Sequence, residues 1–253
     1  MRRLVIVIIA VIAVAAGVCI VTANSLRRRA TDQVTRAEAL AAGLQNLTVG
    51  SSDYKTARAI ATTFGTVPYY NDYGGTRDCA EGYFERCAYM IAINHNRMMR
   101  HPFLRHLGLH DWGGTALIYI ENGIVQEYSF RVSYKTSDVR WRGFGVEEGN
   151  TIPKDRAVQA RISDSYSIQR NDLIAGEPSG KGFDLESSLI PTSSANERRR
   201  AWHFELKCLS QQRGCGEICE VIPDVWRDFY MQRGHFDVDK YGSAYLLCAK
   251  PPI

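Results

Sequence analysis

The chain lacks the short motifs that mark several common enzyme classes. It has no G-x-S-x-G nucleophile elbow, no phosphate-cradling G-x-x-x-x-G-K-[ST] loop and no zinc-binding H-E-x-x-H helix. Each motif holds a nucleophile, a phosphate or a metal ion in a fixed geometry, so nothing in the sequence favours those three kinds of catalysis. We therefore expect a non-catalytic protein without a cofactor, and enzyme activity stays open as the alternative.

The chain also has little excess charge of either sign. Its formal net charge is +4, and Arg2 and Arg3 at the N-terminus supply two of these positive charges. Proteins that bind nucleic acid usually carry clustered Lys and Arg residues and a strongly basic domain. The remaining near-balance excludes a broad basic face, and we expect no nucleic-acid partner.

What the sequence does contain is a long uncharged run from Leu4 to Ala23. A helix rises about 1.5 Å per residue, so a run of this length matches the roughly 30 Å hydrocarbon core of a bilayer. The pattern predicts a transmembrane helix at residues 4–23, preceded by a short cytoplasmic tail of residues 1–3. A cleaved secretory signal is less favoured because its apolar region is usually shorter, and a lipoprotein signal at Cys19 would need a small residue where Val18 stands.

Cationic residues lie on both sides of this run, so the preference of positive charge for the cytoplasm does not settle the orientation. The cysteines give the second argument. Besides Cys19 the chain has an even number of them, which suggests disulfides and hence an extracytoplasmic domain. Buried free thiols and a zinc site remain alternatives. The six candidates for disulfide bonds are Cys79, Cys87, Cys208, Cys215, Cys219 and Cys248.

Cys79 and Cys87 are the pair that we expect most strongly, because only a short loop separates them. The remaining four cysteines cluster toward the C-terminus. Cys215 and Cys219 are one residue too far apart for a catalytic C-x-x-C dithiol, and the intervening Glu217 would raise a thiol pKa. A structural disulfide is the better interpretation of that segment, with a thiol oxidoreductase as a third hypothesis for the function.

Residues 24–66 are predicted to form a helical stalk or helix pair. Apolar residues recur at helical spacing in 31–47, and this helix can continue directly from the membrane helix. A second helix is expected after a break, with Ser51 or Ser52 as its N-cap, Asp53 near its positive end and Gly65 as its stop. Residues 67–253 are expected to form a disulfide-stapled ectodomain.

The clearest local signal in this ectodomain is Asn122-Gly123. It separates two alternating segments, Thr115–Glu121 and Ile124–Tyr134, and predicts a β-hairpin. Asp111 to Gly114 is expected to form a turn before it. Together with a strand at Arg86–Ile93, the hairpin indicates the α+β class: an antiparallel sheet with helices packed on one face.

The remaining segments give weaker signals. We expect strands around residues 158–162, around Trp202, Phe204 and Leu206, and at Ser243–Cys248. A helix is expected at residues 224–232, opened by Pro223. Asn171–Asn196 is expected to be a long surface loop, and residues 197–200 a solvated loop. Glu147 and Glu148 are adjacent, so their side chains should point to opposite sides of a strand.

A group of histidines is the one candidate for a metal site. His95, His101, His106 and His110 lie close together with Met98 and Met99, and His106 and His110 are four residues apart. Imidazole and thioether groups would suit copper. Arg97, Arg100 and Arg105 would repel a cation and Pro102 disturbs the helical spacing. His101, His106 and His110 are therefore only weak metal candidates.

Several segments resemble a family of uncharacterised, single-pass bacterial envelope proteins. The resemblance rests on Leu47-x-Val49-Gly50-Ser51-Ser52, Phe64-Gly65, the Cys79 and Cys87 pair, and the C-terminal motifs. The C-terminal motifs are Ala201-Trp202-His203-Phe204 through Cys208-Leu209, then Arg213-Gly214-Cys215 and Ile222-Pro223-Asp224-Val225-Trp226. The resemblance implies an N-terminal anchor and an extracytoplasmic domain, and it carries no activity.

Taken together, these patterns predict a single-pass protein of the cell membrane whose C-terminal domain is extracytoplasmic. Residues 4–23 would contact the lipid bilayer, and the domain would bind an envelope protein or a cell-wall partner, or serve a structural role. The alternative function is an envelope enzyme or a metal-binding protein that uses the His95–His110 cluster.

Overall fold

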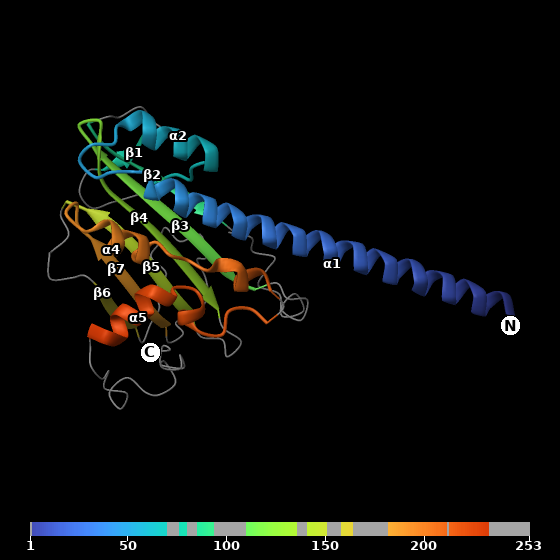
Figure 1. Ribbon diagram of the computed structural model, residues 1–253. Helices are drawn as coiled ribbons and strands as arrows, with labels where there is room; N and C mark the ends of the chain where they lie inside the picture. The colour runs from blue at the N-terminus through green and yellow to red at the C-terminus, as the bar shows by residue number, and fades with distance from the viewer. Residues whose placement is uncertain are drawn as a thin grey trace.

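The computed structural model describes residues 2–69, 76–79, 85–93, 110–135, 141–150, 158–163, 182–211 and 213–232. Within these residues a long N-terminal helix and several short helices pack on a seven-stranded mixed sheet. Figure 1 shows the N-terminal helix projecting far beyond the sheet, so that the N-terminus lies well away from the rest of the chain.

The projecting element is α1 (Arg2–Gln45), one helix of 44 residues. The apolar run and the expected stalk helix are therefore continuous, without a break between them. Large apolar side chains of the run, such as Ile9, Val14 and Val21, are 61–69% exposed. The helix is long and apolar enough to cross a membrane.

The second half of α1 belongs to the hydrophobic core. From Ala30 onward, apolar residues at helical spacing are buried on one side of the helix. They pack against the other helices and against the sheet, chiefly under the segment around residues 206–210. The buried residues of this half are Ala30, Val34, Ala37, Leu40, Ala41 and Leu44.

The second helix, α2 (Tyr54–Phe64), has its N-cap one residue after Ser52, the later of the two expected caps. Its N-cap is Asp53, whose carboxylate accepts a hydrogen bond from the Thr56 N–H at 2.9 Å. The prediction of Ser51 or Ser52 as the cap is wrong, because the Ser52 hydroxyl instead accepts from the Thr48 N–H. Gly65 ends the helix with a φ of 71°, as the sequence predicted.

The sheet has the strand order β1-β2-β3-β4-β5-β7-β6. Its strands are β1 (Arg77–Asp78), β2 (Arg86–Ile93), β3 (Trp112–Glu121), β4 (Ile124–Lys135), β5 (Trp141–Gly149), β6 (Val158–Ser163) and β7 (Gly182–Leu189). The expectation of a purely antiparallel sheet is wrong at two pairs: β1 runs parallel to β2, and β5 runs parallel to β7. All other neighbouring pairs are antiparallel.

The predicted hairpin and the strand at Arg86–Ile93 are confirmed. Asn122 and Gly123 take positive φ values of 52° and 76° and join β3 to β4. The predicted turn before the hairpin is wrong, because β3 already begins at Trp112, which pairs with Tyr134. The long hairpin places the aromatic residues of β4 at the centre of the sheet.

Three strands were not predicted: the two-residue β1, β5 and β7. β5 contains three glycines and two adjacent glutamates, and β7 lies inside the stretch that was expected to be a surface loop. β7 pairs with both β5 and β6, and β5 pairs on its other edge with its sequence neighbour β4. The expected strand near residues 158–162 is confirmed as β6.

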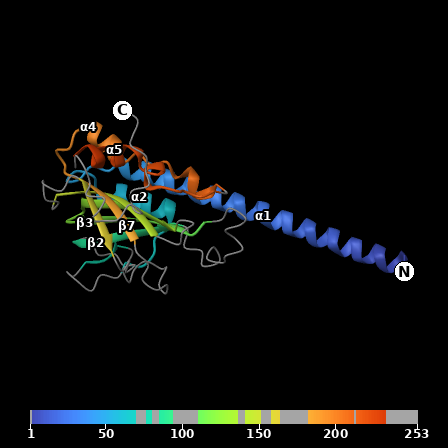
Figure 2. The ribbon, with the colours of Figure 1, turned by 90° about the horizontal axis from the view of Figure 1, so that it is seen from below.

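Helices cover one face of the sheet, and the core lies between them. Figure 2 shows α1, α4 (Ala195–Ala201) and α5 (Pro223–Gln232) on the same side of the strands. The inward row across the sheet runs through Tyr89, Ile118, Tyr128, Glu148 and Leu189, each opposite the next on the neighbouring strand. One member of this apolar row is a glutamate.

The C-terminal part of the described chain is helical and irregular. After α4 come two short 3-10 helices, η3 (Leu206–Ser210) and η4 (Ile218–Glu220), and then α5. The strand expected around Trp202, Phe204 and Leu206 is wrong, and Glu197 to Arg200 form α4 rather than a loop. The helix that Pro223 was expected to open is confirmed, and the strand expected at Ser243–Cys248 lies outside the described residues.

Candidate functional site

A groove of about 450 Å³ lies between the packed half of α1 and the segment that follows α4. One wall comes from α1 and the other from α4, the residues after it and the start of α5. Its lining residues are Glu38, Ala41, Ala42, Gln45, Arg199, Trp202, His203, Phe204 and Asp224.

The helical repeat explains the α1 wall. Residues 38, 41, 42 and 45 are three or four positions apart and so share one side of the helix. Small Ala41 and Ala42 side chains in the middle leave space, whereas longer Glu38 and Gln45 stand at the two ends. The Gln45 amide also donates a hydrogen bond to the Trp202 carbonyl at 3.1 Å, which joins the two walls.

An aromatic cluster forms the floor and connects the groove to the sheet. The Trp202 ring lies 5.6 Å from Tyr128 and 6.0 Å from Phe204, measured between ring centroids. Phe204 in turn lies 5.3 Å from Phe130 and 5.4 Å from Phe144. Such contacts between tilted rings add to the burial of apolar area and hold the chain after α4 in place.

His203 and Asp224 form a polar pair at the edge of the groove. The His203 Nδ1 atom lies 2.8 Å from the Asp224 carboxylate, and Nε2 lies 3.6 Å from the Glu205 carboxylate. Asp224 sits in the first turn of α5, where the helix dipole favours a negative charge, and it also pairs with Arg227. The imidazole is therefore held in one orientation by acidic neighbours.

This pair does not make a nucleophilic site. Catalysis of that kind needs a hydroxyl or thiol within hydrogen-bond reach of the base. No serine, threonine or cysteine is among the described residues that line the groove. The groove as described suits non-covalent binding, with an apolar floor and charged groups at its edges.

Behind the groove lies a buried carboxyl group that sequence reasoning missed. Glu148 is 0% exposed, and its Oε2 atom lies 2.8 Å from the Tyr128 hydroxyl. Its Oε1 atom lies 2.5 Å from the Arg198 guanidinium of α4. Burial raises the pKa of Glu148 above its ordinary value, although Tyr128 and Arg198 both act in the opposite direction. Burial and the nearby Glu148 likewise raise the pKa of Tyr128.

Arg198 links this carboxyl group to the chain before α4. Its guanidinium donates to the Pro191 carbonyl at 2.9 Å and to the Ser193 carbonyl at 3.3 Å. The same helix is capped by Ser194 and Glu197, each of which bonds the backbone of the other. Arg198 thus ties α4 to Glu148 of the sheet, in addition to the packing of α4 against β7.

Glu147 and Glu148 lie on opposite faces of β5, as the sequence predicted. Glu147 accepts a hydrogen bond from the Ser188 hydroxyl at 2.9 Å on the outer face. Glu148 follows Phe144 and Val146 on the inward face, where alternate residues are buried. That alternation was the available signal, but it could not be used because the strand itself was not predicted.

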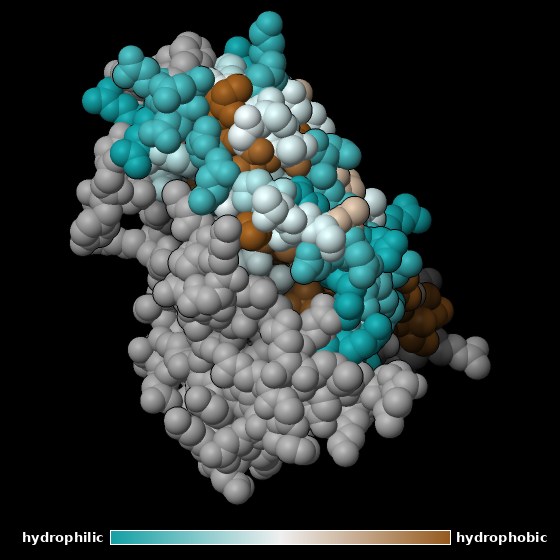
Figure 3. All heavy atoms as spheres, turned by 60° about the vertical axis from the view of Figure 1, so that its left-hand side comes forward, coloured by the Kyte–Doolittle hydropathy of each residue, from teal (hydrophilic) through white to brown (hydrophobic). Residues whose placement is uncertain are grey.

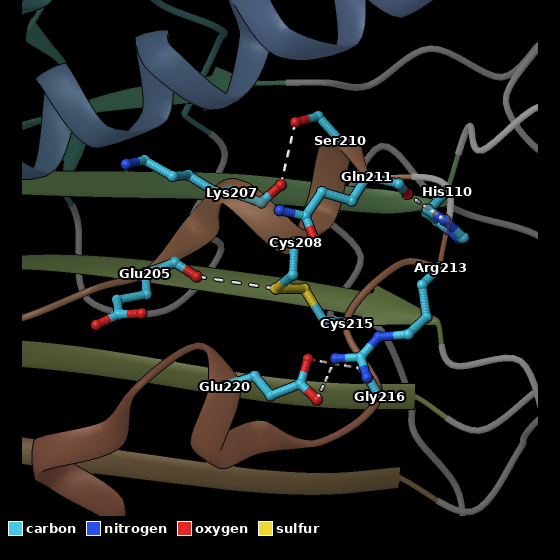
Figure 4. Close-up of a disulfide and its surroundings, with 10 residues drawn as sticks. All are labelled: His110, Glu205, Lys207, Cys208, Ser210, Gln211, Arg213, Cys215, Gly216 and Glu220. Carbon is cyan, nitrogen blue, oxygen red and sulfur yellow. Dashed lines mark hydrogen bonds and ion pairs between the residues drawn. A yellow bond between two sulfur atoms is a disulfide. The ribbon is translucent and has the colours of Figure 1, made fainter.

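The histidine cluster is outside the groove. His95, His101 and His106 lie outside the described residues. His110 is described, and its Nε2 donates to the Gln211 carbonyl at 2.9 Å (Figure 4). Among the residues that the structure describes, no three His, Cys, Asp or Glu side chains come together as a metal site would require.

Two disulfides join cysteines that both lie in the described part of the chain. The predicted Cys79–Cys87 bond is confirmed, and it connects the residue after β1 to β2. Cys208 bonds to Cys215, so a bond between Cys215 and Cys219, whether structural or redox-active, is wrong. Figure 4 shows this second bond beneath η3, with Arg213 and Glu220 paired beside it. Cys248 lies outside the described residues.

Comparison of the chain with protein-family models, with curated proteins and with solved structures gave no match. The resemblance to envelope proteins therefore stays a prediction that rests on the sequence motifs.

Proposed function

We propose that this protein is a single-pass, membrane-tethered domain that stands outside the cytoplasm and binds a protein partner of the cell envelope in the groove. The observation that carries the proposal is the continuity of α1. One helix supplies both the exposed apolar run and a wall of the groove. A binding site built on the anchor itself is held at a fixed place relative to the membrane.

The disulfides support the extracytoplasmic side. Disulfides persist in oxidising compartments and are rare in the cytosol. The two bonds join Cys79 to Cys87 and Cys208 to Cys215, and the second lies under the segment that packs on α1. The domain that carries the groove is therefore suited to the outside of the membrane.

The charges around the groove favour a basic partner segment. Three carboxylates lie in it or beside it, those of Glu38, Glu205 and Asp224. Against them stand two arginines: Arg199, which lines the groove, and Arg227, which pairs with Asp224. The Arg199 guanidinium also donates to the Asn196 side chain. We infer that the occupant is a short segment of an envelope protein with a Lys or Arg residue flanked by apolar side chains, which would lie over Ala41, Ala42 and the aromatic floor.

A photo-crosslinking residue at position 42 tests this proposal in intact cells that make the full chain. Position 39 is the matched control, because Ala39 is also an exposed alanine of α1 but does not line the groove. We expect one adduct of defined mass at position 42, none at position 39, and a basic segment at the crosslink by mass spectrometry. Loss of this adduct in Glu38→Lys is also expected.

Equal crosslinking at both positions, or crosslinks to lipid alone, would overturn the binding proposal. The membrane side is tested separately by labelling thiols with an impermeant reagent in intact cells after reduction. Cysteines of the domain that react only after lysis would place the domain in the cytoplasm.

A further inference from the structure

Glu148 occupies the point at which both walls of the groove meet the sheet. The α4 wall reaches it through Arg198, and the chain just after α1 reaches it through Tyr128, whose hydroxyl lies 3.1 Å from the Leu47 carbonyl. Tyr128 also contacts the ring of Trp202 in the groove floor. A change in the charge of this carboxyl group therefore affects the contacts that hold both walls of the groove.

The hydrogen-bond distances around Tyr128 indicate which protonation state fits this site. Its hydroxyl has one proton but lies within bonding distance of two acceptor atoms, the Leu47 carbonyl and Glu148 Oε2. A single proton can serve both acceptors only as a bifurcated hydrogen bond, whereas each contact has a proton of its own if Glu148 is protonated. The carboxylic acid then donates to Tyr128, and Tyr128 donates to Leu47.

The neutral form also keeps its contact with α4, because Oε1 of a carboxylic acid still accepts from Arg198. Ionisation would leave a fully buried carboxylate with one cationic partner. Arg198 would be shared with the carbonyls of Pro191 and Ser193, and its side chain is 25% exposed. A buried carboxylate gains little stability from an ion pair when its cationic partner is shared with other acceptors and partly hydrated.

We propose that Glu148 is a proton-operated latch: the closed groove holds this carboxyl group neutral, and loss of its proton loosens α4 and the wall that carries Trp202 and His203. The proton leaves to solvent water, and no bond between heavy atoms forms or breaks. Opening of α4 lets water reach the carboxylate, which offsets its burial. In the proposed position outside the cytoplasm, the groove would respond to the pH of the surroundings.

The sign of the effect follows from linkage. Because the pKa of Glu148 is raised in the fold, its contribution to closure is complete below its ordinary value near 4.5 and is lost as the pH rises through the folded pKa. Among described residues, the titratable or charged groups facing Glu148 are Tyr128 of β4 and Arg198 of α4. On α4 itself, the cap holds the pKa of Glu197 below its ordinary value, so acid weakens this cap only at lower pH.

Hydrogen exchange of the full chain in detergent micelles, followed by mass spectrometry, measures the latch directly. The peptide around residues 195–204 is followed from pH 5 to pH 8, with exchange corrected for the intrinsic pH dependence. We expect its protection to fall by up to about tenfold per pH unit until the folded pKa is passed. Glu148→Gln, a neutral isostere, should keep α4 protected throughout and should protect it more than wild type at pH 8.

Glu147→Gln is the matched control, since the neighbouring carboxylate faces the outer side, and it should behave as wild type. Arg198→Gln gives a second readout if Glu148→Gln does not fold, because removing the cation should enlarge the pH-dependent loss of protection. A pH profile that is the same in wild type and Glu148→Gln, or absent in both wild type and Arg198→Gln, would overturn the latch. No partner is needed here, so a failure of the latch and a failure of the binding proposal are distinguishable.

Discussion

The two halves of α1 use similar residues but meet different surroundings. In the first half, Ala, Val and Ile side chains point outward all around the helix, and the large ones are 60–69% exposed. In the second half the apolar residues keep to one side, and polar residues such as Asp32 and Arg36 occupy the other. The difference teaches that the arrangement of apolar residues, rather than their number, separates a helix that packs on a domain from one suited to lipid.

Figure 3 shows the same contrast on the surface. On the face in view, the described part of the domain shows hydrophilic and pale residues with a few scattered apolar ones, whereas a hydrophobic group lies at the lower right, where the protruding helix recedes from the viewer. An all-round apolar helix in water would expose a large area at considerable cost, roughly 25 cal/mol for each Å². This cost is removed if the first half lies in a bilayer, in line with the proposed topology.

The largest expected effect is on the free energy of unfolding. It is tested by truncating one apolar side chain to alanine in each half of α1. Leu40→Ala removes a fully buried side chain and should lower the free energy of unfolding by about 3 kcal/mol, since the cavity it leaves cannot fully close. Val14→Ala, at an exposed position, should leave the urea midpoint of the domain unchanged. Urea unfolding of the full chain in detergent, followed by near-ultraviolet circular dichroism, compares the two. Similar losses in both variants would show that the halves do not differ in packing.

Two glycines test whether the segment that packs on the second half of α1 depends on its contact with His110. Gly214 follows the segment that packs on α1, and Gly65 ends α2; both have a φ of 71°. A Cβ atom at Gly214 would lie 2.7 Å from the His110 ring, whereas nothing lies within 4 Å at Gly65. We expect Gly214→Ala to cost about 3 kcal/mol, from backbone strain and the collision, and Gly65→Ala about 1 kcal/mol from strain alone. Equal urea midpoints in the two variants would exclude a contribution from the His110 contact.

The smallest effect on stability is expected where the halves join. Ser25 is exposed and precedes the first buried residue of α1 by five positions. Ser25→Pro removes a backbone hydrogen bond and kinks the helix, yet it should change the unfolding free energy of the domain by less than about 0.5 kcal/mol. In nanodiscs, energy transfer from a dye on the domain to acceptors on the lipid headgroups should give a broader range of dye-to-membrane distances for Ser25→Pro than for the wild type. Ser25→Ala is the control, and a distribution unchanged by proline would mean that α1 does not set the orientation.

Local sequence signals predicted the elements that local interactions determine. The Asn122-Gly123 turn, the strand at Arg86–Ile93 and the helix opened by Pro223 need little more than their own residues. The apolar run was equally plain, although whether it crosses a membrane stays a proposal. The short Cys79–Cys87 loop could be predicted for the same reason.

The sequence was uninformative where partners lie far apart. β5 places Gly143, Gly145 and Gly149 on the outer face and Glu148 on the inner one, so it has no regular apolar alternation. Only pairing with β4 and β7 makes it a strand. Conversely, the alternation of Trp202, Phe204 and Leu206 imitates a strand, because these residues pack on the core from the irregular chain between α4 and η3.

The groove was missed for a related reason. Its walls are separated by more than 150 positions along the chain, and no motif marks either of them; the Gln45–Trp202 bond alone spans 157 positions. Glu148 was considered only as one of two adjacent carboxylates. Its burial depends on α4, which the sequence suggested to be a solvated loop.

Because the groove is built on the anchor helix, the length of α1 also sets the height of the groove above the membrane. Measured along its axis from Ala23, the end of the proposed span, Glu38 lies about 22 Å away and Gln45 about 33 Å away. With α1 upright, a partner that is itself embedded in the membrane can reach the groove only if its basic segment extends to this height. Insertions of whole helical turns between Ala23 and Ala30 would raise the groove by about 5.4 Å each while keeping its direction, and would thereby change which partners it meets.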